Sequence, residues 1–316
     1  MEKFDITYIH APATYDFRER SIMYGPVSDM VPSTPIFEMY PLGLTTLSEY
    51  LERNGFRARI YNLASMMLNK PGFDVEANLA KLGSRLFGID LHWMPHCHGS
   101  IEVAKILKRL HPDVPIMFGG ISSTIFHADL VAYDCIDYVI RGDSTEEPTR
   151  MLLARVTAAE RTHTSIGDLS DIPNLTWKDS TGTIHVNPLS WVPDTMDAAS
   201  LDYAYPMKGV LRQFDFTSYL PTKGWLKYPV SASLVCRGCK RNCVTCGGSA
   251  TVFRKYFNRA CPAWRDPDLL IRDIQNAQDH LWGPIFVLND FLQAGEDYTR
   301  RFIGGQIGRA SCRERV

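Results

Sequence analysis

The first 160 residues alternate between short apolar runs typical of buried strands and segments whose apolar residues recur with helical spacing. This alternation predicts strands at Phe4–His10, Phe56–Leu63, Arg85–Leu91, Val114–Phe118 and Asp137–Ile140. It predicts helices between and after them, at Leu42–Asn54, Asp74–Leu82, His98–Leu110, Ser123–Ala132 and Thr145–Val156. Strands separated by helices form a parallel sheet that is covered on both faces. We therefore expect an α/β, doubly wound parallel domain over residues 1–160.

Ligands of such sheets bind outside the carboxyl ends of the strands, where several glycines of this chain fall. Glycine lets a bulky ligand approach the backbone closely. Three segments have this placement, at the start of the first helix and after the fourth and fifth strands: Pro41-Leu42-Gly43, Gly119-Gly120 and Arg141-Gly142. The sequence therefore predicts a binding site at this edge of the sheet.

The alternation stops after residue 160 and resumes near residue 228. Residues 161–227 contain a predicted hairpin, Asn174–Val186, and several prolines typical of an extended connection. Residues 228–306 return to strands and helices, which we expect at Val230–Val235, Pro267–Leu281, Pro284–Leu288 and from Glu296 onward. We therefore predict two domains joined by residues 161–227.

Four of the eight cysteines are crowded directly after the strand Val230–Val235. In a reducing compartment such crowding indicates metal binding rather than disulfides. Cys239, Cys243 and Cys246 have C-x3-C-x2-C spacing, which suits three irons of a [4Fe-4S] cubane and leaves the fourth iron open. An all-thiolate zinc site that includes Cys236 is the alternative. We expect Cys236 to be a buried thiol.

The residues around these cysteines resemble the cobalamin-dependent branch of the radical S-adenosylmethionine (SAM) superfamily. The shared features are Arg237-Gly238 before Cys239, Asn242 before Cys243, and Gly247-Gly248 after Cys246. The resemblance implies a Rossmann-like cobalamin-binding domain at residues 1–160 and the start of a partial (β/α) barrel at residues 228–306. It also implies three cofactors: a [4Fe-4S] cluster, SAM and cobalamin. Thr245 departs from the family, which usually has an aromatic residue there.

The resemblance further implies a role for each candidate residue. The cluster would be bound by Cys239, Cys243 and Cys246. SAM would be approached by Gly247 and Gly248 and contacted at its amino group by Asn289 and Asp290. Cobalamin would be contacted by Pro41, Leu42, Gly43, Gly119, Gly120, Arg141 and Gly142.

His92 is a further candidate for contact with cobalamin. Asp90-Leu91-His92 can be compared with the D-x-H-x-x-G signature that supplies a histidine to cobalt, but Pro95 replaces its glycine. The segment also follows the third predicted strand, whereas the signature follows the first. Contact with the corrin, binding of another metal together with His96 and His98, and a simple hydrogen-bonded loop role all stay open.

By resemblance, the parent enzyme would carry a methyl group on cobalamin and transfer it to an unactivated carbon of an unknown substrate, with a flavodoxin or ferredoxin as electron donor. A non-catalytic cobalamin or iron–sulfur sensor is one alternative, and a zinc-binding nucleic-acid-binding protein is another. Residues 203–259 hold ten lysines and arginines and one acid, which suits anionic cofactors. They lack the aromatic-rich pattern of RNA-binding modules, so nucleic acid is not an expected partner.

The composition is that of a globular protein, with 45% hydrophobic residues and a formal net charge of −1. No apolar run is long enough to cross a membrane and no signal peptide is evident, so we expect a cytoplasmic protein without a membrane partner.

Residues 307–316 resemble a translated sequencing adapter and are predicted to be non-native, a polar native tail being the alternative. Because residues 239–306 have room for about two units of roughly 30 residues each, against six strands in the family barrel, we expect this chain to be an inactive fragment.

Overall fold

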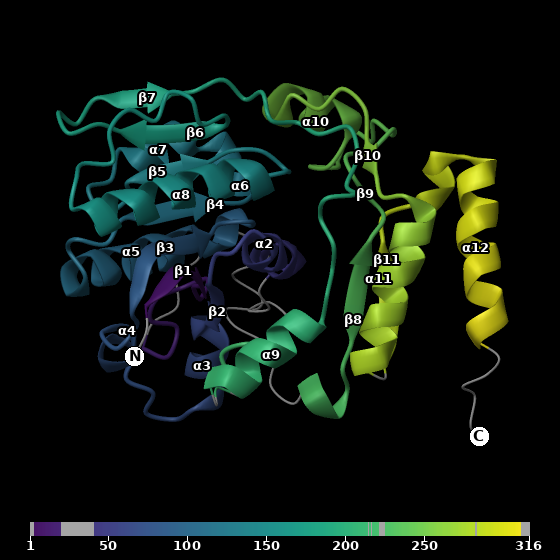
Figure 1. The fold of residues 1–316 in the computed structure, drawn as a ribbon, viewed down its shortest axis with the longest axis horizontal. Coiled ribbons are helices and arrows are strands. Elements are labelled where there is room, and N and C mark those ends of the chain that lie inside the picture. The colour runs from purple at the N-terminus through teal and green to yellow at the C-terminus, as the bar shows by residue number, and fades with distance from the viewer. Residues whose placement is uncertain are drawn as a thin grey trace.

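The computed structural model describes residues 3–19, 41–213, 215, 217–220, 225–281 and 283–310. Its main feature is a seven-stranded sheet in the order β2-β1-β3-β4-β5-β6-β7 (Figure 1). The strands are β1 (Phe4–His10), β2 (Ala58–Asn62), β3 (Ser84–Asp90), β4 (Ile116–Gly119), β5 (Tyr138–Ile140), β6 (Leu175–Lys178) and β7 (Ile184–Val186). Strands β1 to β5 pair in parallel, which confirms the predicted parallel sheet.

The predicted hairpin is present as β6 and β7. It lies in the segment predicted to connect two domains, yet its strands extend the main sheet in antiparallel pairing with β5. The Cα pairs Tyr138–Trp177 and Ile140–Leu175 fix this register. The sheet is therefore larger than the five-stranded sheet expected from the sequence, because the hairpin covers an edge that would otherwise be exposed.

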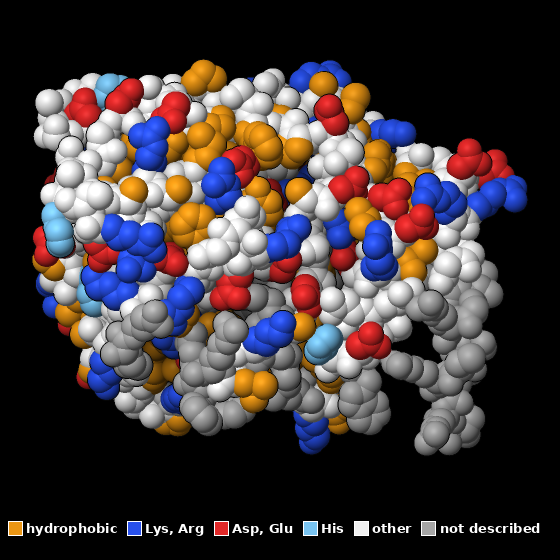
Figure 2. Space-filling model, in the orientation of Figure 1, with side chains coloured by type: hydrophobic (Ala, Val, Ile, Leu, Met, Phe, Trp, Pro, Cys, Tyr) orange, Lys and Arg blue, Asp and Glu red, His pale blue; other side chains and the backbone are white. Residues whose placement is uncertain are grey.

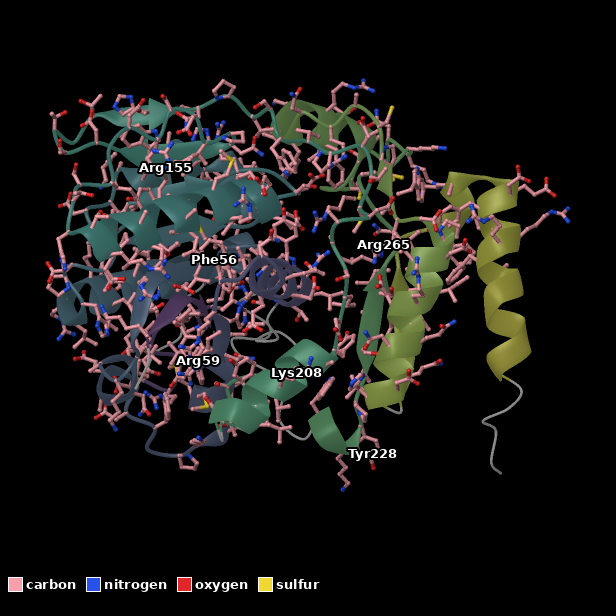
Figure 3. All side chains as sticks on the ribbon, viewed as in Figure 1. Phe56, Arg59, Arg155, Lys208, Tyr228 and Arg265 are labelled. Atoms are coloured by element: carbon pink, nitrogen blue, oxygen red, sulfur yellow. The ribbon has the colours of Figure 1, made fainter. Side chains whose placement is uncertain are left out.

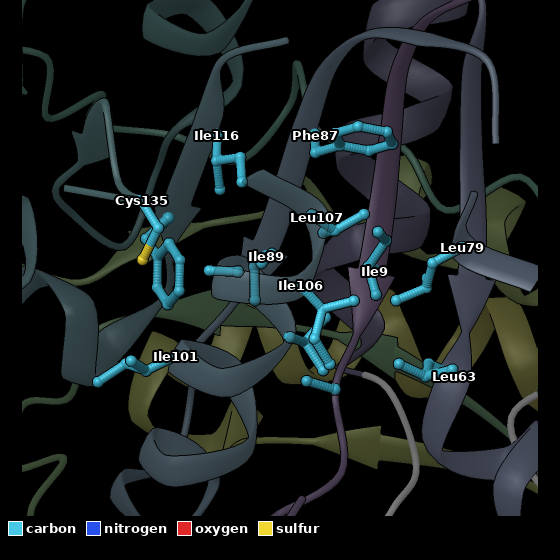
Figure 4. Packing of buried hydrophobic residues seen from close by; sticks show 14 of the residues in the cluster. Ile9, Leu63, Leu79, Phe87, Ile89, Ile101, Ile106, Leu107, Ile116 and Cys135 are labelled. Atoms are coloured by element: carbon cyan, nitrogen blue, oxygen red, sulfur yellow. The ribbon is translucent and has the colours of Figure 1, made fainter. Parts of the chain in front are cut away.

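Helices cover both faces of this sheet, as a doubly wound fold requires. They are α2 (Leu42–Arg53), α3 (Leu63–Asn69), α4 (Val75–Leu79), α5 (Cys97–Leu110), α6 (Ile121–Ile125), α7 (His127–Val131) and α8 (Glu146–Thr162), with a short 3-10 turn η1 (Met94–His96). Alternate strand residues point to opposite faces. Ile9 packs in one core with residues of α3, α4, α5 and α7 (Figure 4), whereas Tyr8 packs in the other with residues of α2 and α8.

Two predicted helices of this part differ from the structure. The helix expected at Ser123–Ala132 is two short helices, α6 and α7, that break at Phe126. The hydroxyls of Ser123 and Thr124 donate to the carbonyls of Gly119 and Gly120, four residues back, and such bonds bend a helix. The helix expected at Asp74–Leu82 is only the short α4, which Asp74 caps through the amide of Ala77.

The remainder of the chain builds two smaller sheets and several helices. Its elements are α9 (Ala204–Gln213), η2 (Trp225–Lys227), β8 (Ser231–Leu234), β9 (Cys236–Arg237), α10 (Ala250–Phe257), β10 (Ala263–Trp264), α11 (Pro267–His280), β11 (Ile285–Leu288), η3 (Phe291–Ala294) and α12 (Glu296–Ala310). Strands β8 and β11 pair in parallel on either side of α11 in sequence, and β9 pairs antiparallel with β10. A parallel strand–helix–strand unit is the repeat from which (β/α) barrels are built.

The last helix passes the predicted boundary at Gln306, since α12 continues to Ala310. The rest of the predicted non-native tail, residues 311–316, lies outside the described residues. The predicted domain limits stay predictions.

The visible surface carries charged groups of both signs scattered among neutral residues, in line with a net charge of −1 (Figure 2). In the described part of the chain, no helix has both the length and the apolar character needed to cross a membrane.

Candidate functional site

A cavity of about 290 Å³ lies at the carboxyl ends of the parallel strands. One side of its wall comes from the ends of the main sheet and from α2, including Tyr8, Leu47 and Met117. The other side comes from the second part of the chain, where β9 and the residue after it contribute Cys236, Arg237 and Gly238. The cavity is thus shared between the main sheet and the segment that leads into the cysteine loop.

Seven of the predicted cofactor-binding residues line this cavity. They are Pro41, Gly43, His92, Gly119, Gly120, Gly142 and Asn289. The wall does not include Leu42, Arg141, Asp290, Gly247, Gly248 or the three predicted cluster cysteines. Asp143, which directly follows the predicted Arg141-Gly142, and Glu146 also line it, and neither was among the predicted cofactor-binding residues.

The two adjacent glycines at the end of β4 have different structural roles. Gly120 has a φ of +114°, and a Cβ there would lie 2.8 Å from the carbonyl group of Leu91. Gly119 has no heavy atom within 4 Å of where its Cβ would be, so its missing side chain leaves the cavity open. Gly120 is therefore required by the backbone, whereas Gly119 adds space for a ligand.

Arg141 is buried away from the cavity and serves the connection to the hairpin. Its Nη2 donates to the carbonyl of Asn187, and its amide donates to that of Asn174. Burial lowers the pKa of its guanidinium. In this structure Arg141 holds residues 174–187 against the sheet.

Asp90 and two histidines form a compact group beside the cavity, which Asp90 and His92 line. Asp90 ends β3 and His10 ends the neighbouring β1, so parallel pairing brings them together. His10 Nδ1 lies 3.0 Å from Asp90 Oδ1, and His92 Nδ1 lies 2.7 Å from Asp90 Oδ2. Burial by itself would raise the pKa of Asp90, but the charges and hydrogen bonds of His10 and His92 outweigh it and hold that pKa far below its usual range.

Corrin contact, binding of another metal and a hydrogen-bonded loop role were left open for His92, and the group formed with His10 and Asp90 is relevant to all three. Its ligand atoms lie within 4.8 Å of one another, and in the described part of the chain no other set of three histidine, cysteine or acidic residues does so. His96 is buried, and its ring centroid is 5.1 Å from that of His92. His98 instead accepts a hydrogen bond from the amide of Tyr15, so it takes no part in the group. His10 was missed: like Asp90 it ends a strand, but only the structure shows that the two strands are neighbours.

The cysteine loop lies between β9 and α10. Cys239 is half-buried, while Cys243 and Cys246 are exposed. The Oε1 atom of Gln293, in η3, accepts a hydrogen bond from the amide of Lys240 at 3.0 Å. The amide of Ala250 donates to the carbonyl of Arg241 at 2.8 Å and closes the loop. Three thiols therefore stand on one short, hydrogen-bonded loop.

Cys236, the fourth of the closely spaced cysteines, has a different environment. It is 4% exposed, and its Sγ donates to the carbonyl of Gly238. Burial raises its pKa to about 11. Tetrahedral zinc with ligands at about 2.3 Å would bring sulfurs to about 3.8 Å from one another. No three cysteine sulfurs among the described residues lie within 4.8 Å, so the structure holds no preformed zinc cage there.

Asn289 and Asp290 directly follow β11 and make different contacts. Asn289 lines the cavity, and its Nδ2 donates to the carbonyl of Cys236 at 2.5 Å. Asp290 caps η3 through the amide of Leu292 and pairs with Arg241 at 3.1 Å. Of the two, Asn289 is placed to meet a ligand in the cavity.

Comparison with known proteins finds similarity both in sequence and in fold. Residues 33–150 match the family described as the B12 binding domain. No curated protein matches the sequence. Among solved structures, the fold is similar to that of the radical SAM methyltransferase TsrM from Kitasatospora setae with cobalamin and a [4Fe-4S] cluster bound. The TM-score is 0.63 at 14% identity over 97% of this chain and 53% of that one.

A second similar structure is that of the cobalamin-dependent SAM radical enzyme OxsB with aqua-cobalamin and SAM bound. Its TM-score is 0.62 at 11% identity, over 98% of this chain and 37% of that one. At such identities the likeness concerns the fold, and this chain spans about half or less of these proteins. Residues 33–150 thus match the B12 binding domain family, within a chain whose fold is similar to that of these two cobalamin-dependent radical SAM enzymes.

Proposed function

We propose that this chain binds cobalamin in the cavity at the strand ends and a [4Fe-4S] cluster, with SAM, at the cysteine loop. The observation that carries the proposal is the shared wall of the cavity. One side belongs to the region that matches the B12-binding family, and the other side is β9, which leads directly into Cys239. A cavity between two cofactor-binding regions is the arrangement that chemistry between two cofactors needs.

The cavity residues fit a large, flat and partly apolar group. Leu44, Leu47 and Met117 offer apolar surface, and the open space beside Gly119 leaves room against the backbone. Asp90 holds Nδ1 of His92, so a neutral His92 would carry its lone pair on Nε2. When bound, cobalamin would supply a methyl carrier, and the cluster with SAM would supply a radical.

The loop residues fit a cluster that leaves one iron open. Three thiols are available on it, and the amide of Gly248 donates to Cys246 Sγ at 3.4 Å, which fixes the position of that sulfur on the loop. A Cβ at Gly247 would have nothing within 4 Å, so the backbone there is open to SAM. Exposure of Cys243 and Cys246 leaves the loop accessible to an electron donor such as a flavodoxin or ferredoxin.

By analogy with the similar folds, the reaction would be methyl transfer to an unactivated carbon. Since this chain spans about half of TsrM, we expect catalysis to need parts of the fold beyond these residues. The substrate would then be bound largely by those parts.

Anaerobic reconstitution tests the proposal. We expect a brown protein with about four irons per chain, and an added absorbance of bound cobalamin in the same molecule. Cys239→Ala, Cys243→Ala and Cys246→Ala should each lower the iron content, while Cys236→Ser should keep it. A colourless protein that takes up zinc through all four cysteines would contradict the proposal and favour the zinc-binding alternative.

A further inference from the structure

Two buried arginines on either side of the cysteine loop reach across to the main sheet. The first is Arg237, two residues before Cys239. Its Nη2 donates to Glu146 Oε1 at 2.5 Å, and its Nη1 donates to Oε2 of the same carboxylate at 3.0 Å. The side chains are 13% and 8% exposed, so this two-point ion pair is largely removed from water. Paired forks of this kind fix both distance and orientation.

The second is Arg259, which follows α10 on the far side of the loop. It donates to both carboxylate oxygens of Asp143, through Nε and through Nη2, the latter at 2.9 Å. These side chains are 2% and 8% exposed. Its Nη2 also donates to Ser144 Oγ at 3.1 Å, and Arg237 Nη1 donates to the same oxygen at the same distance.

Both arginines therefore hold one short segment, Asp143–Glu146, which lies between β5 and α8 inside the region that matches the B12-binding family. Gly238 makes the double contact possible. It has a φ of +99°, and a Cβ there would lie 2.9 Å from Arg259 Cδ. Arg237 is thus explained by its contacts with Ser144 and Glu146, and Gly238 by its closeness to Arg259 and Pro262, before any cofactor is considered.

We infer that these two ion pairs set the separation between the cobalamin site and the cluster loop. Arg237, Arg259, Asp143 and Glu146 are in this view positioning residues for chemistry between the two cofactors. The inference rests on the proposed function, because it assigns a task to the same site. Two pairs on opposite sides of the loop would suppress both its translation and its rotation relative to the sheet.

A matched control separates positioning from simple stabilisation. Arg265 and Asp273 form another buried, two-point pair, with side chains 3% and 9% exposed (Arg265 is labelled in Figure 3). This pair joins the residue that follows β10 to α11 within the second part of the chain and does not line the cavity. Neutralising it should destabilise the protein without changing the gap between the cofactors.

The test uses the full chain reconstituted with cob(II)alamin and a reduced cluster, both of which are paramagnetic. Pulsed electron paramagnetic resonance would measure the cobalt–cluster distance distribution in the unmodified chain, E146Q, D143N and D273N. We expect a narrow distribution in the unmodified chain and in D273N, and a broadened or displaced one in E146Q and D143N. Arg237→Lys keeps the charge but not the planar fork, so it should also broaden the distribution.

Equal distributions in all variants would overturn the inference, as would equal broadening in D273N. If a variant loses a cofactor, the inference is tested instead by amide hydrogen exchange of the cofactor-free chain. E146Q and D143N should then speed exchange in residues 238–249, and unchanged exchange there would refute the inference. If the unmodified chain binds neither cofactor, the proposed function itself fails.

Discussion

Gly119 and Gly120 are neighbours in the sequence, but the structure predicts that replacement by alanine destabilises the protein strongly at Gly120 and little at Gly119. At Gly120 a Cβ would meet the carbonyl of Leu91, and the positive φ alone costs an L-residue about 1–2 kcal/mol. We expect G120A to lower the free energy of unfolding by about 2–4 kcal/mol. We expect G119A to change it by less than about 1 kcal/mol. Urea unfolding at neutral pH measures both, and similar losses would show that the turn after β4 is not as described.

Cysteine reactivity gives a second prediction at the scale of single residues. Thiolates react with iodoacetamide and thiols do not, so a pKa of about 11 and burial should protect Cys236 at pH 8. Cys243, Cys246 and Cys261 are exposed and should be alkylated first. Mass-spectrometric peptide mapping of the reduced, metal-free chain after short labelling resolves them. Early labelling of Cys236 would contradict the buried environment described for it.

Part of the candidate site could be predicted from single residues and their spacing in the sequence. That the three cysteines share one loop and that the glycines lie at strand ends was predictable, because spacing and position along the chain indicate both. The partners of Arg237 and His10 were not, since Glu146 lies 91 residues from Arg237 and Asp90 lies 80 residues from His10. Such pairs depend on which strands become neighbours, and that is a property of the fold.

At the scale of elements, the start of α11 provides a test of helix capping. Asp266 accepts hydrogen bonds from the amides of Asp268 and Leu269, and Pro267 follows it at the first helical position. Replacement by alanine leaves these amides without a side-chain acceptor, so D266A should cost about 1 kcal/mol of stability. D266N keeps the acceptor and should cost only a few tenths. Thermal unfolding compares the two, and equal losses would exclude capping as the cause.

The ion pair of Glu146, at the start of α8, with Arg237 predicts that the stability of the protein depends on pH. Burial would raise the pKa of Glu146, but the charge and hydrogen bonds of Arg237 outweigh it and lower that pKa. The unfolded chain has a value near 4.3, so the stabilisation is fully present above that pH. It is lost as the pH falls toward the lower folded value.

The measurement is the difference in free energy of unfolding between the unmodified chain and E146Q. Breaking a buried pair on one side costs about 3–5 kcal/mol, so we expect a difference of that size from pH 6 to 8. The difference should shrink as the pH falls below about 4. A difference that does not depend on pH would show that the charge of Glu146 is not the source of the stabilisation.

Elements were predicted well where one periodic pattern dominates. Strands β1 to β5, the hairpin, α2, α5 and α11 agree with the sequence to within a few residues because their apolar residues follow a single spacing. The break between α6 and α7 depends on hydroxyl groups that bond to the backbone. Attachment of the hairpin to β5 depends on an open sheet edge. Neither has a periodic signature.

At the scale of the whole molecule, the two parts of the chain differ in how much of the apolar surface of their sheets is covered by other elements. The main sheet has helices on both faces and a hairpin at one edge. The sheet of β8 and β11 has two strands, and apolar side chains near it remain exposed. Phe286 is 59% exposed, and Leu292, in the following η3, is 63% exposed. The cavity site joins a well-covered part to one with open apolar surface.

This open surface predicts self-association of the 316-residue chain. Strand β11 pairs only with β8 in the described residues, and exposed strand edges with apolar side chains template pairing with other chains. Sedimentation velocity across a range of concentrations should show association that Phe286→Lys weakens, because a charge opposes burial of that surface. Leu211→Lys is the control, since Leu211 is similarly exposed, at 63%, but lies on α9. A chain that stays monomeric at high concentration, or an equal effect of L211K, would exclude β11 as the contact.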